Sequence, residues 1–219
     1  MHSSPERNLC ALLNRIPEER VIYSRLTREK EGLMQSLIET TARAKGFRTV
    51  KGKIPGRDDL GDIDLAIVSD SEQLCLLLEL KWFIDPAEVR EILERREELQ
   101  KGITQIEARV AAIRGGCPDC LAMLGRAPLT TQGAIVSNNW IGDSSIQKQS
   151  WPVITEAHLI AKLNSAEALS CVIEWLSRRQ YLPVLGTHFA VQTAELVIGE
   201  WSMEWYAIDS KIETSFLLL

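Results

Sequence analysis

A mixed α/β domain with a small central sheet is the fold class that this sequence predicts. Short β-rich runs alternate with long stretches whose apolar residues have helical spacing, and this alternation indicates that class. The length of 219 residues and the hydrophobic content of 45% suit one globular domain, and they exclude disorder as the main state. Because no run approaches the roughly 20 apolar residues of a membrane helix, the sequence also excludes a spanning protein.

Helices and strands alternate in the first half of the chain. The expected elements are, in order, a helix over 4–16, a helix over 28–45, a strand over 47–53, a strand over 63–68 and a strand over 73–83. Gly46 follows the second helix in the usual C-cap role. The run QLCLLLELKWF at 73–83 is so apolar that we expect a central strand covered on both faces and adjacent to 63–68.

The second half begins with a long helix and ends in a β-rich tail. The expected elements are a helix over 85–113, a strand over 133–140, an extended piece over 151–155, helices over 156–163 and 165–180, and a hairpin over 194–208. Ser165 is the expected cap of the last helix, and Gly199-Glu200 the turn of the hairpin. The predicted organisation is an N-terminal helical extension (1–27), a core (28–183) and a C-terminal β-rich extension of the same domain (184–219).

A local basic stretch stands out in a chain whose net charge is −5. Six basic residues and no acid occur between Thr40 and Arg57: Arg43, Lys45, Arg48, Lys51, Lys53 and Arg57. Such a stripe can bind the phosphates of a nucleic acid even when the whole chain is acidic. A solvated helix end and loop explains the same residues equally well.

Five cysteines and no visible secretory signal favour a reducing, cytoplasmic location over a disulfide framework. Cys117 and Cys120 form a CxxC pair just past the long helix. Structural zinc needs four ligands, and no second close Cys/His pair exists. A redox role is typical of a thioredoxin-like βαβ context, which is missing, so the pair is interpreted as an ordinary loop.

Charged residues interrupt the most apolar strand. Glu79 and Lys81 lie two residues apart, so both side chains point to the same face of the strand. Simply burying these charges among apolar residues would cost free energy. If the two strands are neighbours, Asp64 converges with Glu79 at one end of the sheet. Two carboxylates suit a hard cation such as Mg²⁺, and a lysine beside it can orient water or steady a phosphate. The alternative is a structural salt bridge of Glu79, with Lys81 extending to the strand end.

Gly61-Asp62-Ile63-Asp64, followed after 14 residues by Glu79-Leu80-Lys81, resembles the PD-(D/E)XK nuclease superfamily, which has the restriction-endonuclease-like fold. The segment 34–47 is similar to the helix that precedes the core sheet in that superfamily. The resemblance covers roughly residues 30–140 and implies a small mixed sheet flanked by helices.

The resemblance implies roles for particular residues. Asp64 and Glu79 would be metal ligands, joined by the carbonyl of Leu80, and Lys81 would be the catalytic lysine. Asp62 is a weaker substitute for Asp64. Gln35 stands where many members carry a helical Glu, and Glu39, one turn later, is a partial substitute. In the following helix, Gln105 is placed to touch the substrate or the site; a surface glutamine explains it equally well.

The implied function is a Mg²⁺-dependent nuclease, with Mn²⁺ as a substitute ion, that hydrolyses phosphodiester bonds in DNA more readily than in RNA. The basic residues between 43 and 57 would hold the nucleic-acid backbone. One alternative is a catalytically weak or inactive nuclease-fold protein that binds nucleic acid or takes part in an assembly in a defence, repair or phage system. Another is a structural α/β protein in which Glu79 and Lys81 are only a buried pair. The near-heptad spacing of the long helix leaves a homodimer or a larger assembly open.

Overall fold

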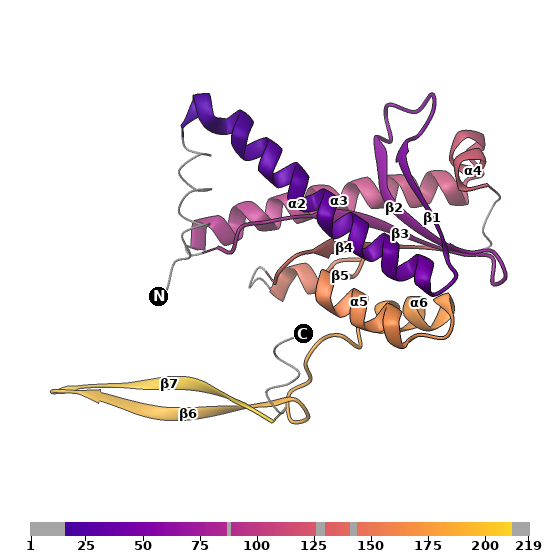
Figure 1. Ribbon diagram of the computed structural model, residues 1–219. Coiled ribbons are helices and arrows are strands. Elements are labelled where there is room, and N and C mark those ends of the chain that lie inside the picture. The colour runs from indigo at the N-terminus through magenta and orange to yellow at the C-terminus, as the bar shows by residue number, and fades with distance from the viewer. Residues whose placement is uncertain (1–15, 87–88, 126–129, 141–143, 212–219) are drawn as a thin grey trace. The chain divides into compact units, whose positions relative to one another are not determined.

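The computed structural model describes residues 16–86, 89–125, 130–140 and 144–211. The chain divides after Ser177 into two compact units, and each is described by itself. The first unit is a mixed α/β domain built around a five-stranded sheet (Figure 1). The expected helix over 4–16 lies outside the described residues.

The sheet has the strand order β1-β2-β3-β4-β5. Its strands are β1 (Arg48–Lys53), β2 (Asp62–Ser69), β3 (Leu74–Lys81), β4 (Thr130–Ser137) and β5 (Val153–Thr155). The first three strands are antiparallel, and β4 and β5 continue in parallel with β3. The predicted pairing of the two apolar runs is therefore confirmed. Strand β3 is the central strand of the sheet, and six of its eight residues are buried, as expected for a strand covered on both faces.

Helices cover both faces of this sheet (Figure 1). They are, in order, the short 3₁₀ turn η1 (Pro17–Glu19), α2 (Arg20–Ala44), α3 (Val89–Arg114), α4 (Pro118–Leu124), the 3₁₀ turn η2 (Ser144–Lys148), α5 (Glu156–Ser165) and α6 (Leu169–Ser177). Helix α2 packs on one face together with α5, and α3 packs on the opposite face against β3 and β4. Helix α2 also runs unbroken through residues 27 and 28, where a boundary between an extension and the core was expected.

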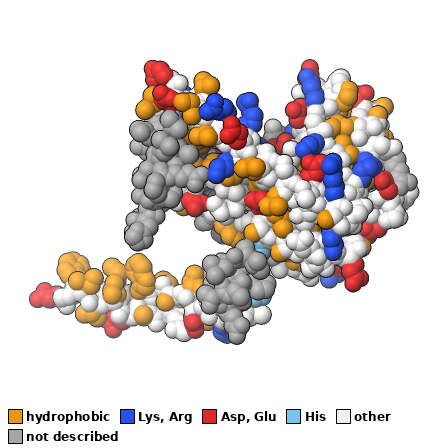
Figure 2. All heavy atoms as spheres, viewed as in Figure 1, with side chains coloured by type: hydrophobic (Ala, Val, Ile, Leu, Met, Phe, Trp, Pro, Cys, Tyr) orange, Lys and Arg blue, Asp and Glu red, His pale blue; other side chains and the backbone are white. Residues whose placement is uncertain are grey.

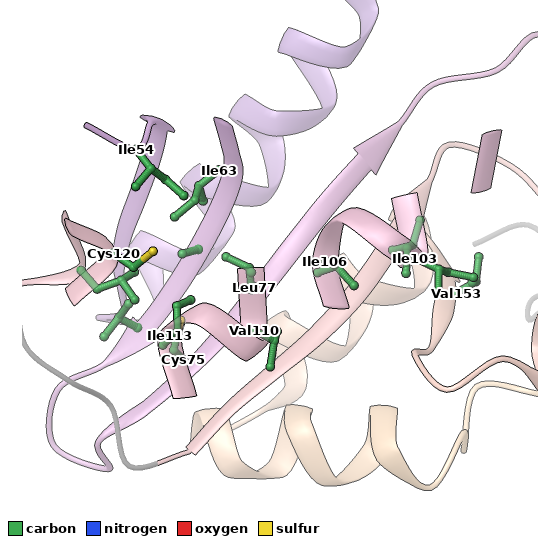
Figure 3. Close-up of a cluster of buried hydrophobic side chains, with 14 of the residues drawn as sticks. Ile54, Ile63, Cys75, Leu77, Ile103, Ile106, Val110, Ile113, Cys120 and Val153 are labelled. Carbon is green, nitrogen blue, oxygen red and sulfur yellow. The ribbon is translucent and has the colours of Figure 1, made fainter. Parts of the chain in front are cut away.

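A continuous apolar core fills the space between the sheet and α3 (Figure 3). Alternate residues of β3 point into it, and α3 contributes residues at helical spacing. The side chains labelled in the figure are Ile54, Ile63, Cys75, Leu77, Ile103, Ile106, Val110, Ile113, Cys120 and Val153. Since Glu79 and Lys81 continue the series that contains Cys75 and Leu77, they emerge at the end of this core.

The second unit contains a β-hairpin of β6 (Phe189–Ile198) and β7 (Trp201–Ser210), with the predicted turn at Gly199-Glu200. The prediction placed its first strand five residues too late. Hydrophobic side chains gather along the hairpin (Figure 2). Exposed members of this group are Val191, Leu196, Val197, Ile198, Trp201, Met203, Trp205, Tyr206 and Ile208. The unit begins at Arg178, six residues before the expected boundary at 184.

Three local predictions differ from the structure. Helix α2 begins at Arg20, whereas the prediction began it at residue 28. The first turns were missed because they carry no buried apolar residues that would show helical spacing. Ser165 ends α5 instead of capping α6; the Glu72 carboxylate accepts the free N–H groups of Leu169 and Ser170 instead. The CxxC pair lies at the start of α4, not in an ordinary loop. Within the described ranges, no helix has both the length and the apolar character needed to cross a membrane.

Candidate functional site

The site is built where β2 and β3 part. Their backbone pairing extends to Leu65 and Leu78. At the next residue, the side chain of Asp64 takes the place of the main-chain hydrogen bonds between the two strands. Its Oδ2 atom accepts the main-chain N–H of Leu80 at 2.8 Å. The Asp64 carboxylate is thereby fixed at the start of the Glu79-Leu80-Lys81 segment, so the structure brings the predicted acid and the ExK segment together.

Glu79 is a buried carboxylate held between two cations. It is 2% exposed. Lys81 Nζ lies 2.8 Å from Oε1, and the guanidinium of Arg109 on α3 donates to Oε2. Arg109 is buried as well, and its Nε donates to the carbonyl of Leu60 at 2.9 Å. The two cationic partners offset the cost of burying this carboxylate among the apolar neighbours of the strand.

Helix α3 approaches these charges closely because it carries Gly102 at the contact. A Cβ atom there would lie 3.3 Å from Cγ of Glu79 and 3.4 Å from Cε of Lys81. Both distances are at or below the close limit of ordinary contacts between carbon atoms. Gly102 therefore makes room for the Glu79–Lys81 pair.

A cavity of about 190 Å³ opens beside Asp64 on the face of the sheet that α2 covers. Its lining combines the end of β2 and β3 with one side of α2: Arg28, Glu31, Gly32, Gln35, Asp64 and Leu80. Glu31 Oε1 accepts the main-chain N–H of Trp82 at 3.4 Å, and the Gln35 amide donates to the carbonyl of Asp64. Glu79 does not line the cavity; it lies buried behind it.

The electrostatics of the cavity favour a cation. Burial, and then the Glu79 carboxylate, raise the pKa of Asp64 to about 6. Burial is also the largest cause that raises the pKa of Glu31. For Lys81, burial alone would lower the pKa, but Glu79, Asp64 and Glu31 outweigh it and raise the pKa. Lys81 therefore stays an ammonium at neutral pH, and the carboxylates would be relieved by additional positive charge.

The residues with predicted supporting roles are distributed differently. Gln35, which stands where the resembling family carries a helical Glu, lines the cavity. Glu39 instead pairs with Lys51 and Arg43 and accepts from Thr49, so its carboxylate is engaged one turn away from the cavity. Gln105 is exposed on α3, and Asp62 is exposed at the start of β2. Neither of these two lines the cavity.

The six basic residues predicted to bind nucleic acid all have protein partners. Arg43 and Lys51 pair with Glu39, and Lys53 pairs with Asp58. The remaining contacts are Lys45 with the carbonyl of Asn164, Arg48 with Asp70, and Arg57 with Asp59. Figure 2 accordingly shows basic and acidic side chains interspersed on the visible face of this unit. Lys51 also contacts Gln35 at 3.2 Å and so reaches a residue of the cavity.

Two residues of the site were not predicted. Glu31 lies one helical turn before Gln35 on α2, so the i, i+4 spacing places both side chains on the cavity. Arg109 follows Gly102 by two turns on α3 and holds Glu79. The spacing of Glu31 and Gln35 was visible in the sequence, whereas the contact of Arg109 depends on how α3 crosses β3.

The donors present suit a hard divalent cation in part. Asp64 and Glu31 supply carboxylate oxygens at the cavity, and Leu80 lines it. The pKa of Asp64 is raised first by its burial and then by the neighbouring Glu79 carboxylate. Glu79 would have to share its oxygens with Lys81 and Arg109. In the part of the chain that the structure describes, no three His, Cys, Asp or Glu side chains already form a metal-binding group.

Comparison with known proteins does not add an identity. No protein-family model, no curated protein and no solved structure gives a significant match to this chain.

Proposed function

We propose that this chain is a metal-dependent nuclease of the PD-(D/E)XK type, with a restriction-endonuclease-like core, that hydrolyses phosphodiester bonds in DNA more readily than in RNA. The observation that carries the proposal is the meeting of Asp64 with the Glu79-Leu80-Lys81 segment beside a cavity that Glu31 also lines. Carboxylate oxygens beside an accessible space, with an ammonium group on the adjoining end of β3, are the kinds of group that phosphodiester hydrolysis needs.

The proposed roles follow from the charges. Asp64 and Glu31, with the main chain at Leu80, would hold Mg²⁺ or Mn²⁺ from the cavity, and Glu79 would complete the negative charge behind them. When bound, the ion supplies Lewis-acid stabilisation of the phosphate and a more acidic water. Because its pKa is raised, Lys81 acts as a cation that orients water and phosphate and not as a base.

Cleavage assays with matched variants test this proposal. Supercoiled plasmid, linear single-stranded DNA and RNA would be incubated with the full chain in Mg²⁺, Mn²⁺ or EDTA. Asp64→Asn, Glu31→Gln and Lys81→Met each should lower cleavage by at least about 100-fold, the scale of losing a charge-stabilising group. The controls Asp58→Asn, Glu29→Gln and Lys101→Met change well-exposed residues and should cleave like the wild type.

The outcomes separate cleanly. Metal-dependent cleavage that survives in Asp64→Asn or Lys81→Met would overturn the assignment of the site. Cleavage of RNA in preference to DNA would overturn the substrate but keep the site. Circular dichroism of every variant shows that a loss of activity is not a loss of folding.

A second candidate is a nuclease-fold protein that binds nucleic acid or takes part in an assembly without cleaving. The observation that favours it is the engagement of both Glu79 oxygens by Lys81 and Arg109, which occupies a carboxylate that a metal would use. Isothermal titration with Mg²⁺ and Mn²⁺ decides between the two. Metal binding that is lost in Asp64→Asn supports the nuclease, and no metal binding by folded protein supports the second candidate.

A further inference from the structure

Two cysteines at the junction of α3 and α4 form a cluster outside the candidate site. Cys117 immediately precedes α4, and Cys120 lies in its first turn. Cys117 is partly exposed, whereas Cys120 is buried in the core on the α3 side of the sheet (Figure 3). The two thiols are hydrogen-bonded to each other. One sulfur of the pair is thus accessible and the other is not.

A guanidinium group faces the accessible sulfur. Arg57 Nη1 donates to Sγ of Cys117 at 3.0 Å. Two hydrogen bonds from Nε and Nη2 to the Asp59 carboxylate, at 2.8 and 2.7 Å, hold the same guanidinium in place. A cation hydrogen-bonded to sulfur favours the thiolate over the thiol, and the thiolate is the nucleophilic form.

The surroundings distinguish the two sulfurs chemically. Hydrogen bonds from the main chain and the thiol of Cys120, together with Arg57, lower the pKa of Cys117. Burial raises the pKa of Cys120 to about 11. The accessible Cys117 is therefore the better nucleophile. The buried Cys120 remains a thiol until a mixed disulfide forms on Cys117.

We propose that Cys117 is a nucleophilic thiol that exchanges with low-molecular-weight disulfides, and that Cys120 resolves the mixed disulfide. The observations that carry the proposal are the hydrogen bond from Arg57 to Sγ of Cys117 and the placement of the buried Cys120 three residues later, in the first turn of α4. The site is independent of the proposed nuclease activity. It assigns chemistry to a CxxC pair that, by its sequence alone, was interpreted as an ordinary loop.

The reaction with glutathione disulfide balances as follows. The Cys117 thiolate attacks one sulfur of glutathione disulfide, so a Cys117–glutathione bond forms and a glutathione thiolate leaves. The Cys120 thiol gives its proton to that thiolate and attacks Sγ of Cys117, which releases the second glutathione thiolate. The protein has then lost two electrons to form the Cys117–Cys120 disulfide, and one glutathione disulfide has been reduced to one thiol and one thiolate, which takes a proton from water.

Mass spectrometry of the full chain tests the two roles. After incubation with glutathione disulfide, the wild type should contain a Cys117–Cys120 disulfide and no stable adduct at these residues. Cys120→Ser and Cys120→Ala should retain one glutathione on Cys117, and Cys117→Ser should show neither product. A folded Cys120 variant that acquires no glutathione on Cys117, or a wild type that forms no disulfide, would overturn the proposal.

Alkylation rates test the part played by Arg57 without altering a cysteine. In the wild type at pH 7, iodoacetamide should modify Cys117 at least about threefold faster than the exposed Cys171, since the rate follows the thiolate fraction. Arg57→Gln should slow Cys117 by a smaller factor, because the hydrogen bonds from Cys120 remain, and should leave Cys171 unchanged. Arg90→Gln, which changes an exposed arginine paired with Glu94, is the control and should alter neither rate. Equal rates at both cysteines in the wild type, or no effect of Arg57→Gln, would contradict the mechanism.

Discussion

The main-chain N–H of Leu80 donates to the Asp64 carboxylate at 2.8 Å, one step beyond the last backbone pair of β2 and β3. Here the Asp64 side chain accepts the hydrogen bond that a main-chain carbonyl accepts elsewhere between β2 and β3. It therefore fixes Asp64 near Glu79, although the two carboxylates repel each other. The first two predictions follow from this proximity of the two carboxylates.

Replacing Asp64 by asparagine should stabilise the protein at neutral pH in the absence of divalent metal. The pKa of Asp64 is raised from 3.8 to about 6, so its ionisation costs folding free energy as pH rises through that interval. The cost is absent below about pH 4 and complete above about pH 6, and it amounts to about 3 kcal/mol. Asparagine keeps an oxygen that can accept the Leu80 N–H. Urea unfolding of both proteins in EDTA at pH 4 and pH 8 measures the difference.

Added Mg²⁺ should reverse that ranking if the proposed metal site is correct. Binding to the folded wild type raises its free energy of unfolding, whereas Asp64→Asn should gain little. Asp58→Asn, at an exposed position, should behave like the wild type at both pH values. A stability of Asp64→Asn that falls below that of the wild type at pH 8 in EDTA would contradict the first of these predictions.

Removing Arg109 should destabilise the fold because it leaves Glu79 with one cation instead of two. Arg109→Met should cost about 3–5 kcal/mol, the usual penalty for breaking a buried ion pair. The double variant Arg109→Met/Glu79→Gln should recover part of this loss, because it removes the uncompensated charge. Chemical denaturation of the single and double variants gives the coupling energy. Strict additivity of the two substitutions would show that the ion pair does not account for the loss.

Two glycines in long helices form a matched pair for substitution by alanine. At Gly32 a Cβ atom meets nothing within 4 Å, so Gly32→Ala should stabilise α2 by about 1 kcal/mol. At Gly102 the same methyl group presses on Glu79 and Lys81, so the gain should be cancelled or reversed. Thermal unfolding of the two variants compares them directly. An equal gain at both positions would show that α3 can move away from the charged pair without cost.

Glu72 should contribute to stability as a remote cap of α6. Its carboxylate accepts the N–H groups of Leu169 at 2.8 Å and Ser170 at 3.1 Å. Glu72→Ala should therefore cost about 1 kcal/mol, as other cap deletions do, and the exposed neighbour Glu167→Ala should cost far less.

The contribution of Glu72 should depend on pH. Burial acts to raise its pKa, but hydrogen bonds, first among them that of Ser170, lower it below the ordinary value of 4.5. The stabilisation is present above about pH 4.5 and is lost as pH falls through the lowered value. Unfolding curves of the wild type and Glu72→Ala should therefore converge in acid. A constant difference down to pH 2 would rule out the carboxylate as the cap.

Much of the sheet was predictable because its strands are strongly apolar and bounded by turn residues. The runs containing Leu65 and Leu77 were assigned correctly, together with their pairing. The start of α2 was not, since residues 20–27 lie on the helix before it reaches the core and show no buried stripe. The capping of α6 by Glu72 could not be foreseen either, because the two segments are separated by almost 100 positions in the sequence.

By itself, the sequence determined the mixed α/β class and the same-face placement of Glu79 and Lys81, because a strand's side chains alternate with a period of two. It also marked Asp64 as an acid in the neighbouring strand. Only the tertiary structure decided that Asp64 bonds to Leu80, that Glu31 joins the cavity, and that Arg109 and Arg57 face Glu79 and Cys117. These contacts depend on the angle and position at which helices and loops meet the sheet, which local periodicity does not encode.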